Sequence, residues 1–277
     1  VVLASPQSQS MMAINEVNNQ LWVVNPDNDS VSTIDMQKNQ LLSEYNLNTL
    51  LATSESLHPT SLALDSNNNV WVTLRDSNQI VILSPQGQLL NQIETGYGSR
   101  PQSILANSNG TVMFVTMGSR GLVDANNGSL VKFNAATNTE TDRVELGPLP
   151  RAMALTGDDN RIFVAEFLAR ENHAVIWEIN ANNLSINHQI ILNRDRGRRG
   201  LDSGGSDGPG VPNYITDLTI SPDHQWLWYS ASKADTFRGL FFQQDTEINL
   251  AASHDTTIRS ILGRIDLGTN PPTEPEF

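Results

Sequence analysis

Short apolar runs alternate with short polar breaks between Pro59 and Thr95. Each run is rich in Leu, Val, Ile and Thr, and each break carries residues that favour turns, such as Ser, Asn, Asp or Gly. The runs are Pro59–Asp65, Asn69–Arg75, Gln79–Pro85 and Leu89–Thr95. We therefore predict four antiparallel strands in this stretch. A single sheet of this kind leaves two apolar faces uncovered, so it requires similar sheets on either side.

The same unit recurs along the chain. Its second strand returns as LWVVN, VWVTL, VMFVT, IFVAE and LWYSA, which aligns Trp22, Trp71, Met113, Phe163 and Trp228 at intervals of 49, 42, 50 and 65 residues. A four-stranded unit repeated roughly every 40 to 50 residues is typical of a β-propeller, whose blades bury each other's faces. The predicted fold class is therefore all-β, a β-propeller of four-stranded antiparallel blades, with the three tryptophans in its core.

Five repeats are visible within a single predicted domain that covers residues 1–277. The approximate blades are 9–47, 59–95, 101–147, 150–192 and 215–267, with a long loop at 193–214 and a Pro-rich tail at 268–277. In the last blade we predict the third strand at Arg238–Gln243 and the fourth strand in the sequence SILGRIDL. Two arrangements stay open: a closed five-blade ring, or part of a propeller of about seven or eight blades. The absence of an initiator Met favours the second, whereas Val1–Ala4 is a candidate strand for closing a ring.

Charge and composition narrow the functional classes. The chain has 17 basic and 30 acidic residues, a net charge of −13, which disfavours nucleic acid as a partner. It has no cysteine, which excludes disulfides, thiolate metal sites and CxxCH haem attachment within these residues. It has no run of 18 apolar residues, so we expect no membrane-spanning helix. The acidity and the many Asn, Ser and Thr residues favour a periplasmic, secreted or cell-surface location.

The long connections are predicted on one rim of the propeller, which we call the long-loop rim. It holds the connections between the second and third strands of each blade and those between blades, and function in such scaffolds lies on the long loops. Eleven of the 17 basic residues fall there, with eleven of the 30 acidic ones. An arginine-bearing rim suits an anionic ligand or a carboxylate-bearing partner, although the same arginines could form structural ion pairs. The candidate binding residues are Arg100, Arg120, Arg151, Arg170, Asp76, Tyr214, Arg238 and His58.

The sequence evidence for metal sites is weaker than that for the rim residues. The segments Asn25–Asp29, Asp65–Asn69 and Asp124–Gly128 resemble calcium-binding patterns, but each lacks the remaining ligands of a calcium loop, and side chain–backbone bonding in a tight turn explains Asp65–Asn69. A mononuclear site built from His58, His173 and a loop carboxylate is the alternative. We expect no catalytic residue and no cofactor within this chain, with calcium as the one ion considered.

The sequences LWVVNPDNDSVSTID and HPTSLALDSNNNVWVTLRDSNQIVIL resemble the YVTN family of bacterial β-propeller repeats. In that family a Tyr-Val-Thr/Ala-Asn strand precedes a polar turn and a Val-Ser-Val-Ile-Asp strand, and VVNPDNDSVSTID matches this order. MFVTMGSRG and FVAEF depart from it. The resemblance implies the propeller of a surface or periplasmic protein, some of which join such blades to a cytochrome c peroxidase-like dihaem region.

The predicted function is that of an extracytoplasmic binding or scaffold propeller, which holds a partner protein or an anionic ligand on its long-loop rim. The chain is not expected to be an enzyme. The first alternative is a metal-dependent propeller lactonase or lyase. The second is a non-enzymatic structural piece of a larger redox surface protein, in which case the partner is the remainder of a larger propeller.

Overall fold

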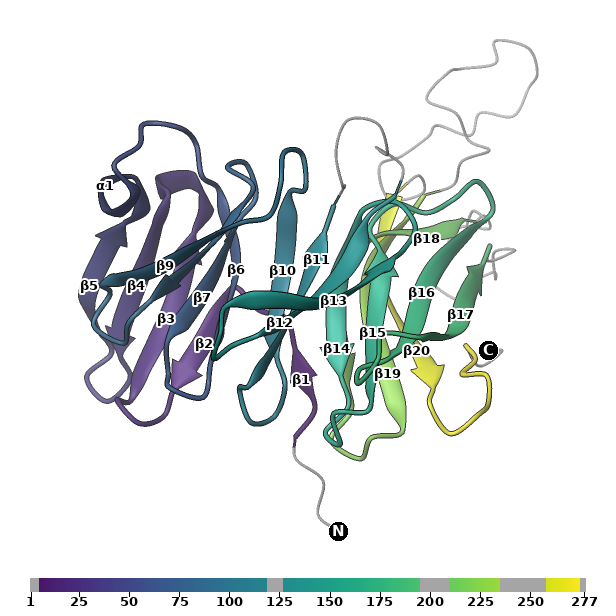
Figure 1. Cartoon of the computed structure of the whole chain (residues 1–277). Helices are drawn as coiled ribbons and strands as arrows, with labels where there is room; N and C mark the ends of the chain where they lie inside the picture. The colour runs from purple at the N-terminus through teal and green to yellow at the C-terminus, as the bar shows by residue number, and fades with distance from the viewer. Residues whose placement is uncertain (1–4, 119–126, 195–209, 235–257, 275–277) are drawn as a thin grey trace, which may run out of the picture.

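The computed structural model describes residues 5–118, 127–194, 210–234 and 258–274, and it is a β-propeller of five blades (Figure 1). Outside the strands, the described residues form one short α-helix, α1 (Leu47–Leu51), and one 3₁₀ turn at Pro26–Asn28. No helix in these described segments has the length and hydrophobicity needed to cross a membrane. The predicted fold class is thus confirmed.

Each blade is an antiparallel meander whose strands follow chain order. Blade one contains β2 (Met12–Asn15), β3 (Gln20–Asn25), β4 (Ser30–Asp35) and β5 (Gln40–Asn46). Blade two contains β6 (Pro59–Leu64), β7 (Val70–Leu74), β8 (Gln79–Leu83) and β9 (Leu89–Glu94). Blade three contains β10 (Pro101–Ala106), β11 (Val112–Met117), β12 (Ser129–Asn134) and β13 (Thr139–Glu145). Blade four contains β14 (Pro150–Leu155), β15 (Arg161–Glu166), β16 (His173–Asn180) and β17 (Ile186–Asn193). Blade five contains β18 (Val211–Ile220), β19 (Trp226–Ala234) and β20 (Ile258–Asp266).

Blade five departs from the predicted strand assignment. The sequence SILGRIDL lies in β20, which pairs directly with β19 from Trp226↔Asp266 to Ala234↔Ile258. It is therefore the third strand of this blade and not the fourth. The other edge of β19 is occupied by β18. The predicted third strand Arg238–Gln243 lies outside the described residues.

A large aromatic side chain in the second strand packs each blade onto the next one. Trp22, Trp71 and Phe163 lie in the clusters that join blades one and two, two and three, and four and five. In blade three this residue is Phe114, because Leu105↔Phe114 pairs as Ala63↔Trp71 does. The sequence alignment chose Met113 and was wrong by one residue, which places Met113 on the opposite face of the sheet.

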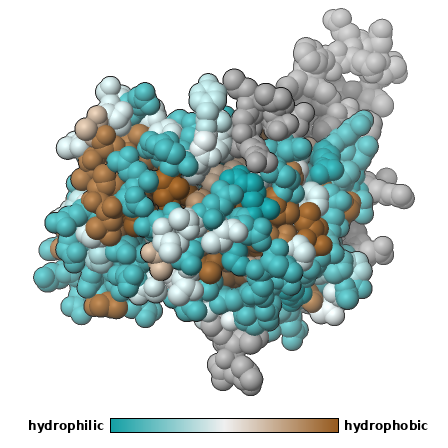
Figure 2. Space-filling view, viewed as in Figure 1, coloured by the Kyte–Doolittle hydropathy of each residue, from teal (hydrophilic) through white to brown (hydrophobic). Residues whose placement is uncertain are grey.

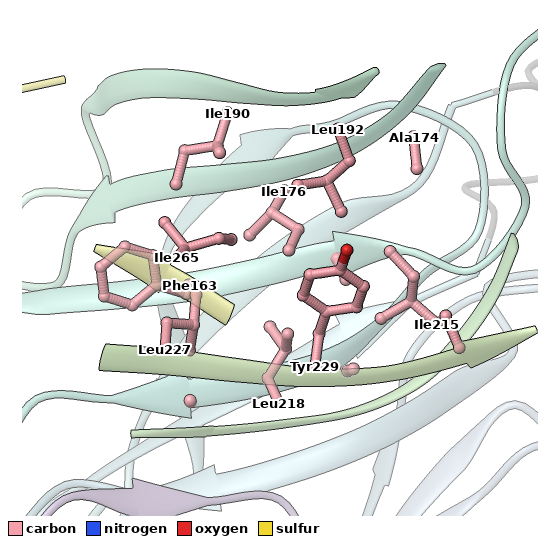
Figure 3. Packing of buried hydrophobic residues seen from close by; sticks show 14 of the residues in the cluster. Phe163, Ala174, Ile176, Ile190, Leu192, Ile215, Leu218, Leu227, Tyr229 and Ile265 are labelled. Carbon is pink, nitrogen blue, oxygen red and sulfur yellow. The ribbon is translucent and has the colours of Figure 1, made fainter. Parts of the chain in front are cut away.

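Four apolar clusters hold the five blades together, one between each successive pair. The face of the molecule shown in Figure 2 is mostly hydrophilic, with separate apolar areas. Figure 3 shows the cluster between blades four and five, in which Phe163 and Ile176 of blade four face Leu227 and Tyr229 of blade five. Since a closed ring of five blades requires five such clusters, the described residues form an open arc. Trp228, which we expected in the core, is only half-buried, on the side of blade five that faces away from blade four.

Threonine hydroxyls tie the long-loop end of the central blades together. Thr73 donates a hydrogen bond to the backbone oxygen of Gln102 in the next blade at 3.2 Å. Thr116, at the equivalent position of blade three, donates to the backbone oxygen of Arg151 at 3.3 Å. These are the threonines of the VWVTL and VMFVT strands, so this residue of the repeat links neighbouring blades.

The segment before blade one runs through the middle of the arc. β1 (Gln7–Ser8) pairs with β14 of blade four and lies near the centre of the molecule (Figure 1). The amide of Gln9 donates to the backbone oxygen of Thr216 in blade five at 3.1 Å. The backbone oxygen of Ser10 accepts from the Ser61 hydroxyl of blade two at 2.8 Å. This segment therefore joins three blades from the inside, whereas Val1–Ala4, the predicted closing strand, lies outside the described residues.

The tight turns opposite the long-loop rim confirm the turn interpretation of Asp65. Its carboxylate accepts hydrogen bonds from the backbone N–H groups of Asn67 and Asn69 at 2.8 and 2.9 Å. It also accepts from the Trp71 indole at 3.3 Å. Blade one has Asn15 at the equivalent position, and there both the Asn15 amide nitrogen and the Trp22 indole nitrogen are buried without a partner.

Substitutions at these two turns should change stability in opposite directions. Asp65→Asn turns an acceptor into a donor that faces the Trp71 indole, and it should lower the free energy of unfolding by about 1–3 kcal/mol. Asn15→Asp gives the buried Trp22 indole an acceptor and should raise it by about 1 kcal/mol. Urea unfolding followed by tryptophan fluorescence measures both. Destabilisation by both substitutions would contradict the proposed equivalence of the two turns.

Candidate functional site

Three of the predicted rim residues lie at a position where the backbone is left-handed in four of the blades. His58, Arg100 and Leu149 directly precede the innermost strands of blades two, three and four, and Tyr214 occupies the equivalent position within β18. All four have φ between 48° and 52°. Three of them precede proline, where the left-handed conformation is especially unfavourable. A shift in strand register follows each of them. The apolar Leu149 shares this conformation with three polar residues. The conformation is therefore a property of the connection between blades and not of a ligand site.

Asp76 gathers basic side chains on the long-loop rim. The Arg75 guanidinium donates to its carboxylate at 2.8 Å, and the Arg100 guanidinium lies 4.0 Å away. The hydrogen bond from Arg75 lowers the pKa of Asp76, against the effect of burial, and the charges of Arg75, His58 and Arg100 lower it further. The structure thus brings together three predicted site residues, His58, Asp76 and Arg100, with Arg75 as an additional member.

Arg151 lies in an aromatic setting beside this group. Its guanidinium is 4.7 Å from the centre of the Phe167 ring, which is 5.3 Å from the ring of Tyr214. Burial lowers the pKa of Arg151, and the charge of Arg75 lowers it further. Within the described part of the chain, no carboxylate forms an ion pair with Arg151. Arg151 is therefore a half-buried cation with an aromatic neighbour and a nearby like charge.

Arg170 has a different environment. Its guanidinium donates to Glu166 at 2.7 and 3.2 Å, and Glu166 is fully buried and also accepts from the Trp177 indole at 3.2 Å. Gly147 leaves the space for this carboxylate, since a Cβ there would lie 1.7 Å from a Glu166 oxygen. This is a structural ion pair within blade four. A role of Arg170 in partner binding stays a prediction, and Arg120 and Arg238 lie outside the described residues.

Two neighbours in this site were missed from the sequence. Arg75 follows the second strand of blade two directly, and Phe167 follows that of blade four, so both occupy the start of a long-loop-rim connection. A position directly after the second strand is the sequence signal that could have identified both residues. Asp76 pairs with Arg75 and Arg100, whereas Arg151 lies near Arg75 and has no ion pair with a described carboxylate. We call these four residues the centre of the rim. They are three arginines and one acid, so the centre of the rim is locally positive in a chain of net charge −13.

A hollow of about 820 Å³ lies towards the opposite rim. It is bounded by the inner strands of blades one to three and by the segment that carries β1, and its walls combine Met12, Ile14 and Leu62 with small polar residues of the turns. Its one carboxylate, Asp65, already accepts hydrogen bonds from the backbone of its turn.

The described segments contain no group of three His, Cys, Asp or Glu residues that could hold a metal ion. His58 and His173 both lie in these segments, and neither belongs to such a group. In the calcium-like segment Asn25–Asp29, the Asp29 carboxylate accepts hydrogen bonds from the backbone N–H groups of Leu57 and His58. Asp124, of the segment Asp124–Gly128, lies outside the described residues.

Solved structures similar to this one are β-propeller proteins. The chain matches hydrazine synthase of Kuenenia stuttgartiensis over 98% of its own length, with a TM-score of 0.71 and 11% identity, and spans 65% of that chain. It matches a protein from Lactobacillus plantarum over 82% of its length and 67% of that chain, with a TM-score of 0.56 and 14% identity. It matches virginiamycin B lyase from Staphylococcus aureus over 86% of its length and 70% of that chain, with a TM-score of 0.51 and 14% identity.

Identities this low show the shared fold alone. No protein-family model matches the sequence, and no curated protein is similar to it in sequence. The resemblance to the YVTN family therefore stays a prediction, while the propeller fold that it implied is confirmed.

The two rim arginines should differ in their effect on stability. Arg170→Met leaves the buried Glu166 with the Trp177 indole as its one remaining partner and should lower the free energy of unfolding by about 1–3 kcal/mol, a value moderated by the solvent exposure of Arg170. Arg151→Met removes a charge whose depressed pKa shows that folding disfavours it at neutral pH, so the melting temperature should stay constant or rise. Thermal unfolding of both variants tests this, and a larger loss from Arg151→Met would show that Arg151 is a structural residue.

Proposed function

We propose that this protein is a binding or scaffold propeller that holds an acidic partner on the centre of its long-loop rim. The observation that carries the proposal is Arg151, a half-buried guanidinium without a carboxylate partner among the described residues. A charge held in this way lowers the stability of the free protein, and a carboxylate from a partner relieves that cost. A guanidinium also recognises a carboxylate through two parallel hydrogen bonds.

The aromatic neighbours indicate the chemistry of the partner. Phe167 stacks on Arg151, Tyr214 is 45% exposed, and Tyr97 on the blade two to blade three connection is 78% exposed. Exposed tyrosines and arginines are the residues that most often dominate the binding energy of protein interfaces. A peptide segment with carboxylates next to apolar side chains matches this combination, and a protein partner is therefore favoured over a small anion.

The resemblance to YVTN repeats supports an extracytoplasmic scaffold. Composition favours a periplasmic, secreted or cell-surface location, and we include that location in the proposal. The chain spans 65% and 67% of the first two similar structures, and these likenesses concern the fold alone, so we base no activity on them. The metal-dependent lactonase or lyase alternative receives no support from the described residues, because none of them forms the required ligand cluster.

Binding of an acidic peptide tests the proposal. The probe is a fluorescent peptide rich in Glu and Phe, compared with a counterpart that has Gln at every Glu position. A protein of net charge −13 repels an acidic peptide unless a local positive site captures it, so the acidic form should bind more tightly than its Gln counterpart and should lose affinity with added salt. Fluorescence anisotropy measures both.

Arg151→Glu should weaken the binding of this peptide at least tenfold, with a melting temperature close to that of the parent protein. Lys38→Glu makes the same change in charge on a solvent-exposed turn of the opposite rim and is the matched control. Equal binding by the Arg151 variant, or equal loss in both variants, would refute a specific role for the rim centre.

A further inference from the structure

The open arc leaves one face of blade one uncovered. Because side chains alternate along a strand, Ala13 and Trp22 pack against blade two while their neighbours point away. The six apolar residues that point away form the free face of blade one: Met12, Ile14, Leu21, Val23, Ile34 and Leu41. Three of these side chains, Met12, Ile14 and Leu41, are 51%, 54% and 62% exposed.

This free face repeats, position by position, a face that is buried elsewhere in the molecule. The cross-strand row Ile14↔Leu21↔Ile34↔Leu41 of blade one has its counterpart in the row Leu64↔Val70↔Leu83↔Leu89 of blade two. The row in blade two packs against blade one. The free face of blade one is therefore built to receive a preceding blade.

Blade five ends the arc with the complementary half of such an interface. In the other four blades, the face that packs on the next blade carries the large aromatic of the second strand. In blade five that residue is Trp228, and Thr219↔Trp228↔Arg264 matches Ala63↔Trp71↔Ile82 of blade two. We call this side the free face of blade five, and among the described residues it includes Asp217, Thr219, Trp226, Trp228, Leu262, Arg264 and Asp266. Leu262 is 69% exposed.

Arg264 extends the aromatic surface of the free face of blade five. Its guanidinium lies 4.1 Å from the Trp226 ring and 5.8 Å from the Trp228 ring. Asp217 and Asp266 lie on the same side of this sheet, and Glu44 shares the free side of blade one. The match between the two free faces therefore lies in their equivalent strand positions and not in their net charges.

We propose that copies of this chain associate head to tail, with the free face of blade five of one copy against the free face of blade one of the next. The contact continues the stacking of blades, with Trp228 in the role that Trp22, Trp71, Phe114 and Phe163 have inside one copy. Because the two surfaces differ, the interface is heterologous, and it leaves one free face at each end of a dimer.

Sedimentation velocity across the micromolar range tests the association. The parent protein should shift from monomer to larger species as its concentration rises. Ile14→Asp on blade one and Trp228→Ala on blade five should each weaken the association at least tenfold. Met12→Asp is the second variant for blade one, and circular dichroism confirms the folding of each. Leu90→Asp, an equally exposed apolar residue on the outer strand of blade two, is the control and should associate like the parent.

A mixture of two defective variants separates the alternatives. Ile14→Asp keeps an intact blade five face and Trp228→Ala keeps an intact blade one face, so their equimolar mixture should form heterodimers that neither forms alone. A parent protein that stays monomeric at all concentrations overturns the proposal and leaves a different polypeptide as the source of the covering blade. Association that survives Trp228→Ala, or a mixture without heterodimers, also overturns it, because the contact is then not blade five against blade one.

Discussion

Each contact between blades depends on one buried aromatic side chain at the middle of the second strand. Trp22, Trp71, Phe114 and Phe163 all point forward into the next blade, and the next blade receives them on a face of aliphatic side chains. Loss of such a side chain typically costs about 3–5 kcal/mol, a large part of the stability of a domain. Because these four side chains occupy equivalent positions in their blades, every contact between blades has the same direction along the chain.

This directional packing explains why the molecule has two unlike ends. A blade that only receives an aromatic, or only presents one, is left with one uncovered face, and in this structure blade one and blade five are in that situation. The N-terminal segment reduces the problem at the centre of the arc, where it bonds to blades two, four and five. It does not cover the outward sides of the terminal blades. The polar network at the top of blade one, in which Glu44 accepts from Ser30 at 2.6 Å, covers only part of that face.

The sequence predicts the strands well because half-buried strands and tight turns have strong local signals. Alternation fails where both faces are buried, since VMFVTM is apolar without a break and does not show which residue faces which blade. Only the pairing Leu105↔Phe114 resolves this. The placement of SILGRIDL as a fourth strand fails for a related reason, because an apolar run predicts a strand but does not show which strand lies beside it. Which strand pairs with β19 is decided by tertiary contacts and not by local composition.

The site is predictable to the extent that the repeat places its members. His58, Arg100 and Tyr214 lie at equivalent positions of three blades, and their common placement on one rim follows from the blade topology. The ion-pair partners of the rim arginines are not predictable in this way. The sequence does not distinguish Arg170, which bonds to the buried Glu166, from Arg151, which has no carboxylate partner among the described residues, because in each case the decisive neighbour is set by loop conformation. Arg75 and Phe167 matter to Arg151 for the same reason.

The apolar clusters between blades supply most of the cohesion of the fold, and they lie apart from the binding site that we propose. The threonine links and the Arg170–Glu166 ion pair add to this cohesion near the long-loop rim. A scaffold of this kind tolerates an uncompensated guanidinium at its rim, because the cost is small beside that of a lost interface. The position of Arg151 next to Arg75, without a carboxylate partner among the described residues, is thus an unfavourable arrangement for the free protein. The acidic partner that we propose would supply the missing negative charge and relieve that cost.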